Sequence, residues 1–249
     1  MAMARSVLHM LWMLLTVVPV ALYLLTCALL GASSHFLYRV AVFWLWLAVA
    51  GAQKILGIRY QIEGAHHLPS QDKPAVLLVK HQSTYETFLM PVIMPRDLAY
   101  VFKKELLYVP FFGWAIGRLD MIHIDRRLRK QAFHKVAQQG RELLQKGIWV
   151  IMFPEGTRIP RGQVGQYKSG GTRLAVDAGV PVVPVAVNSA RCWPRKAFVK
   201  HAGVVTVSIG APIESHGREP DELMAEVQQW IEAEMRRLDP EAYPATAPR

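Results

Sequence analysis

The chain has 249 residues, 52% of them hydrophobic and only 19% charged, which allows one large core and predicts that part of the chain avoids water. Its net charge of +10 comes without a zinc finger, an RNA-binding aromatic signature or a basic region with heptads, so an anionic lipid surface is favoured over nucleic acid. Two distant cysteines, Cys27 and Cys192, are too few for a disulfide framework or a metal site.

Two apolar segments at the start of the chain predict membrane-anchoring helices within residues 1–56. Residues 7–30 contain no charged side chain, which corresponds to about 36 Å of helix against a hydrocarbon core of about 30 Å. The next charge-free run, residues 40–53, is 14 residues long and too short to span a bilayer alone. Residues 31–35 indicate a turn between the two helices, and Pro19 predicts a kink in the first.

The charges around these helices leave two arrangements open. Residues 1–56 contain Arg5, Arg39 and Lys54 and no acid, so positive charge lies at both ends and near the turn. The positive-inside rule therefore does not decide between a hairpin entering from the cytoplasmic face and one spanning helix followed by an interfacial one.

Residues 57–249 show strands alternating with helices. Apolar runs at 76–79, 148–153 and 182–187 are typical of buried parallel strands, and further strands are expected at 57–63, 99–102, 121–124 and 204–209. Helical patterns cover 85–90, 128–145, 171–178 and 219–238, the first of them ended by Pro91 and Pro95. This alternation predicts an α/β fold with a central, mostly parallel sheet flanked by helices. We expect Tyr100 and Trp114 in the core and a frayed end after Asp239.

The stretch VKHQSTYETFLM, residues 79–90, places a histidine and an acid around a small polar patch. A neutral imidazole can take a proton from a hydroxyl when a carboxylate on its other nitrogen fixes the tautomer. Five residues of helix would turn His81 and Glu86 roughly 140° apart. The two can meet only if His81 lies ahead of the helix, in the turn after the strand, and Glu86 reaches back.

Four ordered blocks extend this signal: KHQSTYE, KKELLYVPFFGWAIGRLDMIHIDR, FPEGTR and VPVVPVAV. Over roughly residues 60–215 the chain resembles the lysophospholipid acyltransferases of the glycerol-phosphate acyltransferase superfamily, and among them the 1-acyl-glycerol-3-phosphate acyltransferases. These enzymes have membrane-anchoring N-terminal helices, which favours the hairpin. One departure is Glu86, because the family has an aspartate there.

The resemblance implies acyl transfer from a thioester to a glycerol hydroxyl, a reaction that needs a base and a seat for the substrate phosphate. We assign His81 as the base and Glu86 as the residue that orients it. The phosphate-binding site should be cationic. Arg158 is expected to donate two hydrogen bonds to the phosphate, assisted by the candidates Lys103, Lys104, Arg126 and Lys168. In the FPEGTR loop, Glu155 is expected to hold a basic partner or the loop, Gly156 to permit a tight turn, and Thr157 to line the acceptor site.

The expected function is thus acylation of 1-acyl-glycerol-3-phosphate to phosphatidic acid by a membrane-bound enzyme. Its co-substrate would be acyl-CoA or acyl carrier protein, with no cofactor, metal or nucleic acid. Its place would be the inner (cytoplasmic) membrane, with the catalytic domain on the cytoplasmic face. Two alternatives stay open: an acyltransferase acting on another lysolipid, such as a lyso-aminolipid, which Glu86 keeps in view, and a non-catalytic lipid-binding membrane protein.

Overall fold

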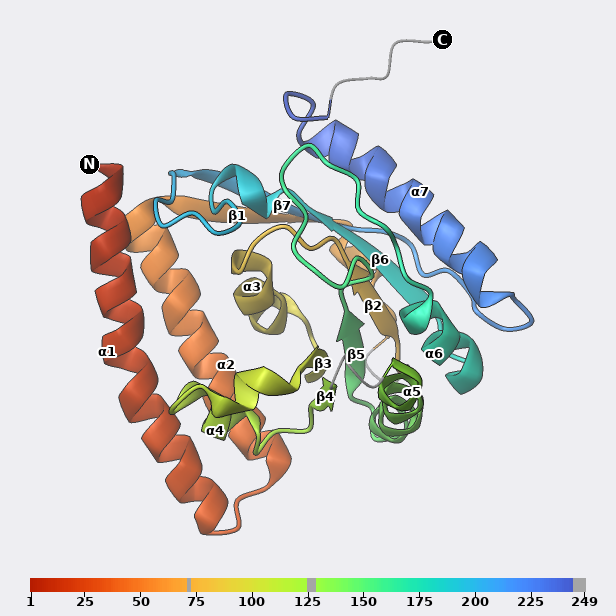
Figure 1. Ribbon diagram of the computed structural model, residues 1–249, viewed down its shortest axis with the longest axis horizontal. Coiled ribbons are helices and arrows are strands. Elements are labelled where there is room, and N and C mark those ends of the chain that lie inside the picture. The colour runs from red at the N-terminus through yellow and green to blue at the C-terminus, as the bar shows by residue number, and fades with distance from the viewer. Residues whose placement is uncertain (71–72, 125–128, 244–249) are drawn as a thin grey trace.

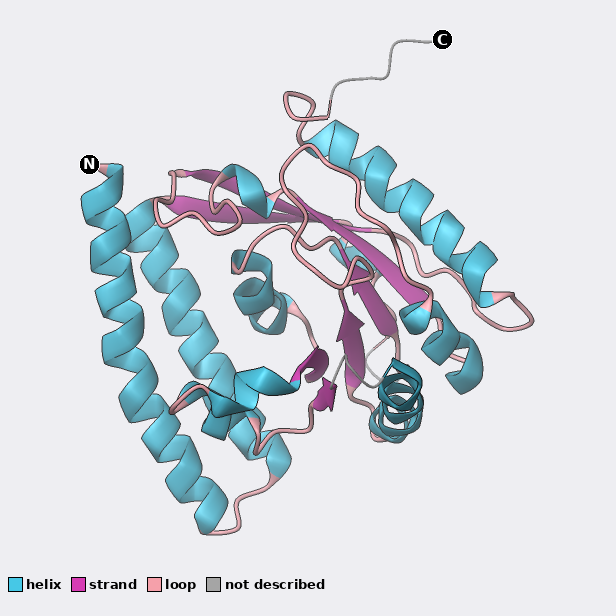
Figure 2. Ribbon diagram, viewed as in Figure 1, coloured by secondary structure: helices cyan, strands magenta, loops and turns pink. Residues whose placement is uncertain are grey.

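The structure, a computed structural model, describes residues 1–70, 73–124 and 129–243 (Figure 1). Within these ranges one seven-stranded sheet has the order β1-β7-β6-β2-β5-β3-β4 (Figure 2). The strands are β1 Ile58–Glu63, β2 Val76–Val79, β3 Leu98–Lys103, β4 Ile122–Ile124, β5 Trp149–Met152, β6 Val182–Val187 and β7 Gly203–Ile209. Only the β6–β7 pair is antiparallel, so the sheet is mostly parallel and the predicted α/β class is confirmed.

Helices cover both faces of this sheet. They are α1 Ala2–Leu29, α2 Ser34–Gly51, α3 Tyr85–Ile93, α4 Phe112–Ile116, α5 Arg129–Gln145, α6 Gly170–Ala178 and α7 Pro220–Leu238. Alternate residues of β2 point to opposite faces: Leu77 and Val79 join the core under α2 and α3, whereas Val76 and Leu78 join the core under α5, α6 and α7. A strand buried on both faces must be apolar throughout, which explains why its sequence is a continuous hydrophobic run.

The two N-terminal helices form an antiparallel pair beside the sheet, with α1 as the outermost element (Figure 1). Ser33 begins α2 by accepting the Phe36 N–H on its hydroxyl. A π-helical turn, Ala52–Leu56, prolongs α2, so the second helix is longer than the charge-free run of residues 40–53 predicts. By length and composition alone, both helices could cross a membrane.

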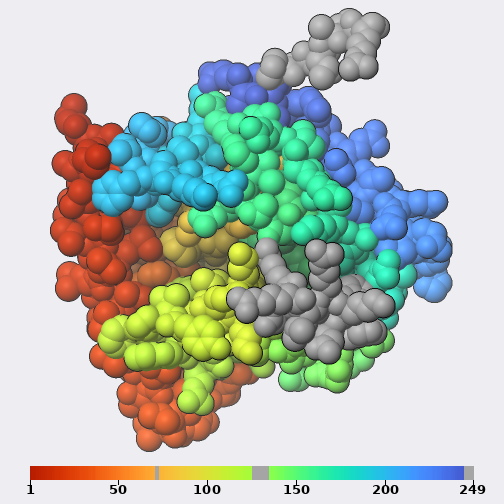
Figure 3. Space-filling view, in the orientation of Figure 1, coloured from red at the N-terminus to blue at the C-terminus, as the bar shows by residue number. Residues whose placement is uncertain are grey.

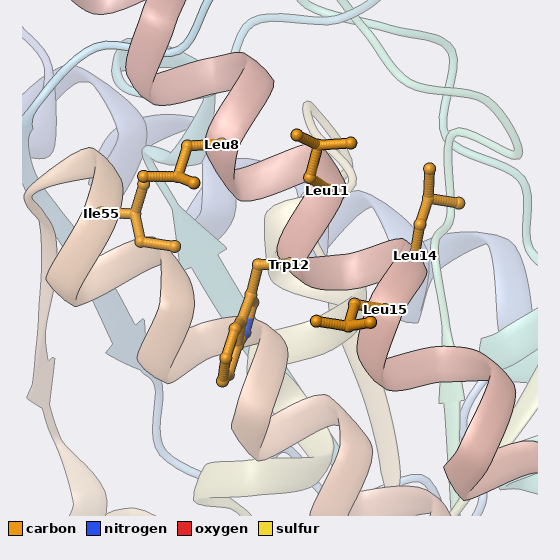
Figure 4. Close-up of a pocket in the computed structure, with 6 residues that line it drawn as sticks. All are labelled: Leu8, Leu11, Trp12, Leu14, Leu15 and Ile55. Atoms are coloured by element: carbon orange, nitrogen blue, oxygen red, sulfur yellow. The ribbon is translucent and has the colours of Figure 1, made fainter.

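His9 and Trp12 of α1 face α2, whereas several leucines of α1, though not the buried Leu24, face outward. His9 Nε2 lies 3.1 Å from the Ala48 carbonyl oxygen, and Trp12 Nε1 donates to the Leu47 carbonyl at 2.9 Å. On the outer side, Leu11 is 53% exposed and Leu15 is 73% exposed. Figure 4 shows these two leucines with Leu8, Leu14, Trp12 and Ile55 around a shallow apolar groove. This helix therefore presents its more apolar side away from the domain, the reverse of a soluble surface helix.

Three expectations from the sequence are wrong. Pro91 lies inside α3, which continues to Ile93; the Thr87 carbonyl that a residue-91 N–H would have bonded accepts the Tyr100 hydroxyl at 3.1 Å instead. Trp114 is 50% exposed, so it is not a core residue. The predicted fraying after Asp239 is wrong for residues 240–243, because Asp239 and Tyr243 are both buried, and the rest of that prediction, residues 244–249, lies outside the described residues.

Replacing Tyr100 by Phe should test the compensation at Pro91. Without the hydroxyl the Thr87 carbonyl lacks its partner, and the free energy of unfolding should fall by about 1–2 kcal/mol in urea denaturation. In the Tyr100→Phe background, Pro91→Ala supplies a backbone N–H to the same carbonyl and should recover part of the loss. Equal stability of Tyr100→Phe and the wild type would contradict this account.

Candidate active site

The sequence blocks meet at one edge of the sheet. Strands β2, β3, β5 and β6 run parallel, so their carboxyl ends lie at the same edge, where open α/β sheets form their sites. His81 follows β2, the FPEGTR loop follows β5, Lys103 ends β3 and Ser189 follows β6. In Figure 3 this part of the molecule shows a recess with α3 at its floor, bordered by the N-terminal hairpin and by the segment around α4.

His81 and Glu86 are in direct contact. His81 lies in the turn ahead of α3, and its Nδ1 is 2.9 Å from Oε1 of Glu86, in the first turn of that helix. With Nδ1–H directed at the carboxylate, the lone pair of the ring sits on Nε2. No described residue forms a hydrogen bond with Nε2, and the His81 side chain is 15% exposed. The imidazole can therefore accept a proton from a molecule in the recess.

The Glu86 carboxylate is fully buried and is satisfied by hydrogen bonds. Its Oε1 also accepts the backbone N–H groups of Gln82 at 2.8 Å and Ser83 at 2.7 Å. Its Oε2 accepts the Ser189 hydroxyl at 2.6 Å. These donors, together with the N-terminal end of α3, stabilise a buried negative charge that forms no ion pair with a lysine or arginine of the described residues.

The FPEGTR loop holds the imidazole from the other side. The Phe153 ring stacks on the His81 ring with centroids 3.9 Å apart and planes inclined by 16°. The His81 carbonyl accepts the Ile159 N–H at 2.8 Å, and the His81 N–H donates to Glu155 Oε2 at 2.9 Å. Gly156 has a φ of +66°, a left-handed conformation that favours glycine in this tight turn.

The expected cationic residues fall into two groups. Arg158 Nη1 donates to the Thr84 hydroxyl at 2.7 Å, which brings its guanidinium to the His81 turn. The Lys168 ammonium lies close to the FPEGTR loop. Its Nζ is 3.2 Å from the position that a Cβ on Gly156 would occupy. Lys103 and Lys104 are exposed at the end of β3, and Thr157 is exposed in the FPEGTR loop. Arg126 lies outside the described residues.

Lys104 has basic neighbours of its own. Burial, followed by the charges of Lys135 and Lys104, lowers the pKa of His123 on β4. A neutral His123 accepts a hydrogen bond more readily, and its Nε2 lies 2.8 Å from the Lys135 ammonium. This end of β3 and β4 is thus a second cationic patch of the described surface.

Sequence reasoning missed two residues that the structure brings to the site. Ser189 contacts Glu86 across 103 positions of sequence, and Lys80 is fully buried directly before His81. For Ser189 the available signal was its position, a hydroxyl soon after the buried VPVVPVAV strand. For Lys80 it was a lysine at the end of an apolar strand, where burial requires an acidic partner. No group of three His, Cys, Asp or Glu in the described ranges could hold a metal ion.

Comparison with known proteins places this architecture in one family. The sequence model of the family described as Acyltransferase matches residues 59–188. The chain is 44% identical over 200 residues to the 1-acyl-sn-glycerol-3-phosphate acyltransferase of Pseudomonas aeruginosa, covering 79% of this chain and 77% of that protein. It is 32% identical over 174 residues to the Homo sapiens 1-acyl-sn-glycerol-3-phosphate acyltransferase alpha, and that match spans 60% of the human protein's length.

A solved structure shows the same fold. The crystal structure of PlsC, the 1-acyl-sn-glycerophosphate (LPA) acyltransferase from Thermotoga maritima, matches with a TM-score of 0.78 and 23% sequence identity over the whole of both chains. The chain described here belongs to the acyltransferase family.

Replacing Ser189 by Ala should weaken catalysis more than stability. The Glu86 carboxylate would lose one of its donors, and a less firmly held carboxylate orients the imidazole less well. We expect kcat to fall about tenfold with KM little changed, a loss typical of one hydrogen bond to a charged group. Ser215→Ala is the matched control, because that buried hydroxyl donates to the carbonyls of Ala175 and Val180, which lie outside the candidate site. Equal kcat values for the two variants would contradict the role of Ser189.

Proposed function

We propose that this enzyme transfers a fatty acyl group from an acyl thioester to the free hydroxyl of 1-acyl-glycerol-3-phosphate, giving phosphatidic acid for phospholipid synthesis. The observation that carries the proposal is the contact between His81 and Glu86 beside the FPEGTR loop. The similarity to 1-acyl-sn-glycerol-3-phosphate acyltransferases supports the choice of acceptor.

His81 would act as the general base. As the acceptor hydroxyl attacks the thioester carbonyl, Nε2 takes its proton, and Glu86 stabilises the imidazolium that forms. The tetrahedral intermediate then collapses with cleavage of its C–S bond, and the departing thiolate takes the proton from Nε2 and leaves as the thiol. No covalent acyl-enzyme is required, because the thioester is already activated.

Arg158 would bind the phosphate of the acceptor. Its guanidinium is held at the His81 turn by the neutral hydroxyl of Thr84, and no acid among its described contacts competes for it. A planar guanidinium can bind a phosphate with two hydrogen bonds. Lys168, in the same loop, would add charge, whereas Lys103 and Lys104 would approach from the end of β3. Either acyl-CoA or acyl carrier protein suits this basic protein as donor, since both are acidic.

Acyl-transfer assays on the purified protein test this function. With acyl-CoA or acyl carrier protein as donor, the wild type should acylate 1-acyl-glycerol-3-phosphate, and His81→Ala should lose about 10²- to 10⁴-fold in kcat while still binding membranes. Arg158→Ala should raise KM for this acceptor about ten- to a hundredfold, the cost of charge-assisted hydrogen bonds. The same variant should leave transfer to 1-acyl-glycerol, which lacks the phosphate, nearly unchanged.

Other outcomes identify the alternatives. Retained turnover in His81→Ala would refute the base, and equal losses on both acceptors would refute the phosphate role of Arg158. Faster transfer to a lyso-aminolipid would make that lipid the acceptor. No transfer to any acceptor would favour a non-catalytic lipid-binding protein.

The N-terminal hairpin would hold the enzyme on the bilayer. Helix α2 packs against α3, for example through Trp44 and Phe88 with ring centroids 5.7 Å apart, and cannot enter the bilayer core without losing these contacts. The outward leucines of α1 have no such partner. A hairpin lying in one leaflet buries these leucines and keeps α2 on the domain. We place it on the inner (cytoplasmic) membrane with the catalytic domain on the cytoplasmic face, where acyl thioesters are available.

The distribution of basic residues also supports attachment of this side of the molecule to the bilayer. Residues 1–62 and 189–213 each contain four basic residues and no Asp or Glu, so they carry eight of the ten net positive charges. The two segments are neighbours in the structure: the Lys200 N–H donates to the Ser6 hydroxyl at 2.9 Å. A basic surface beside exposed leucines is complementary to anionic headgroups.

Vesicle flotation tests this attachment. The double variant Leu11→Glu, Leu15→Glu should bind phosphatidylglycerol-containing vesicles at least about tenfold more weakly, because two half-exposed leucines no longer enter the acyl region. Val164→Glu, a change at a 50% exposed apolar residue outside both basic segments, is the control and should bind like the wild type. Binding that survives the double change would exclude the outer face of α1 as the membrane contact.

A further inference from the structure

A buried cluster of one lysine and two glutamates lies behind the catalytic turn. The Lys80 ammonium is 2.8 Å from Glu155 Oε1 and 2.6 Å from Glu232 Oε1. The side chains of Lys80 and Glu155 are fully buried, and that of Glu232 is 6% exposed. The three residues come from separate parts of the chain: the end of β2, the FPEGTR loop and helix α7.

This cluster is bonded to the catalytic histidine through its backbone. Glu155 uses one oxygen for Lys80 and the other, Oε2, to accept the His81 N–H at 2.9 Å. The Ile159 N–H holds the His81 carbonyl, so the FPEGTR loop fixes both polar groups of the histidine backbone. The position of the imidazole therefore depends on where the Glu155 carboxylate lies.

Glu232 links the Glu155 carboxylate to helix α7 through Lys80, which contacts both acids. It holds the Lys80 ammonium and also accepts the Tyr167 hydroxyl at 2.7 Å. Nearby, the Gln82 side-chain amide donates to the Tyr243 hydroxyl at 2.5 Å. Helix α7 and the residues after it thus contact the residues on both sides of His81, although the family match ends at residue 188.

Stability alone does not require such a cluster. Taking charges out of water is costly, and well-packed apolar residues of similar volume often stabilise a protein as much as a buried ion pair does. Burial by itself lowers the pKa of Lys80, but Glu155 and Glu232 outweigh it and raise the pKa overall, so the lysine stays charged. A charged cluster bonded to the catalytic backbone therefore indicates a role in geometry.

We propose that Lys80, Glu155 and Glu232 are positioning residues that set the place of His81 Nε2 relative to the acceptor hydroxyl, so that helix α7 controls the rate without touching substrate. This inference rests on the proposed role of His81 as the base. Its consequence is a defect in kcat rather than in acceptor binding, because Arg158 is held separately by Thr84.

Two variants of the full-length enzyme probe the cluster from opposite sides. Lys80→Met leaves the buried carboxylates of Glu155 and Glu232 without their lysine, and the Glu155 carboxylate, which also holds the His81 N–H, must move or take up a proton. A displacement of the base by about 1 Å is enough to reduce kcat about a hundredfold, and KM should stay within about threefold of the wild type. Glu232→Gln keeps the shape and the Lys80–Glu155 pair but removes one charge, and should reduce kcat about tenfold.

A rescue and a matched control separate positioning from simple stabilisation. In Lys80→Met, Glu155→Gln, the amide oxygen can still accept the His81 N–H and needs no counter-charge, so kcat should recover at least about tenfold over Lys80→Met. Glu234→Gln is the same change two residues along α7, where the acid bonds Ser208 and Arg237 instead, and its kcat should equal that of the wild type. All rates are measured well below the melting temperatures, with folding verified by circular dichroism.

The outcomes are distinct. A kcat that falls in Lys80→Met and Glu232→Gln, recovers in the double variant and stays unchanged in Glu234→Gln supports the proposal. Lower melting temperatures with wild-type kcat and KM would overturn it, as would an equal loss of kcat in Glu234→Gln. If Lys80→Met does not fold, the comparison of Glu232→Gln with Glu234→Gln decides alone. Failure of the proposed function is detected separately, by full turnover in His81→Ala.

Discussion

A buried carboxylate that forms no ion pair with a lysine or arginine must have its charge satisfied by hydrogen bonds, and within the described part of the chain Glu86 is such a group. Its donors are the imidazole of His81, two backbone N–H groups of the turn before α3, and the Ser189 hydroxyl after β6. Losing one donor would leave part of a buried charge unsatisfied. The turn, the start of α3 and the end of β6 are therefore held in one relative position, and the imidazole with them.

The same constraint explains a glutamate where the resembled family has an aspartate. The Glu86 side chain starts within the first turn of α3 and reaches back to the end of β2. Its Oε1 accepts N–H groups of the turn after β2, and its Oε2 accepts the Ser189 hydroxyl. The longer side chain thus links two strand ends, those of β2 and β6, through one carboxylate. This geometry concerns the orientation of the His81 imidazole, the proposed base, and supports no particular acceptor.

Helix α3 connects the site to the N-terminal hairpin. It begins at the turn that holds His81, and its outer side packs on α2, which in turn packs on α1 (Figure 1). In the proposed reaction both substrates carry acyl chains. If the hairpin lies in the bilayer, His81 is one helix away from it, so a lipid substrate can reach the imidazole without leaving the membrane entirely. The Lys80 cluster holds the same turn from the side of α7, opposite the hairpin.

The sequence by itself determined most of the helices and strands and their order, because hydrophobic spacing along the chain reflects which residues a helix or strand must bury. The strands β2 and β6 lie at the predicted residues, since double-sided burial demands uninterrupted apolar runs. The parallel sheet then required the blocks that follow β2 and β5 to meet at one edge. That His81 would precede α3, with Glu86 reaching back, also followed from helical geometry.

The tertiary structure alone decided which distant groups complete the site. Glu232 and Lys80 are 152 residues apart, and no local pattern indicates that they pair. Pro91 remains within a helix because Tyr100 supplies a donor from another strand, and Trp114 is exposed although its residue type favours burial. Each of these results depends on the surroundings of a side chain in three dimensions. Those surroundings are fixed only when the helices pack on the sheet, whereas hydrophobic periodicity is a property of the amino-acid sequence itself.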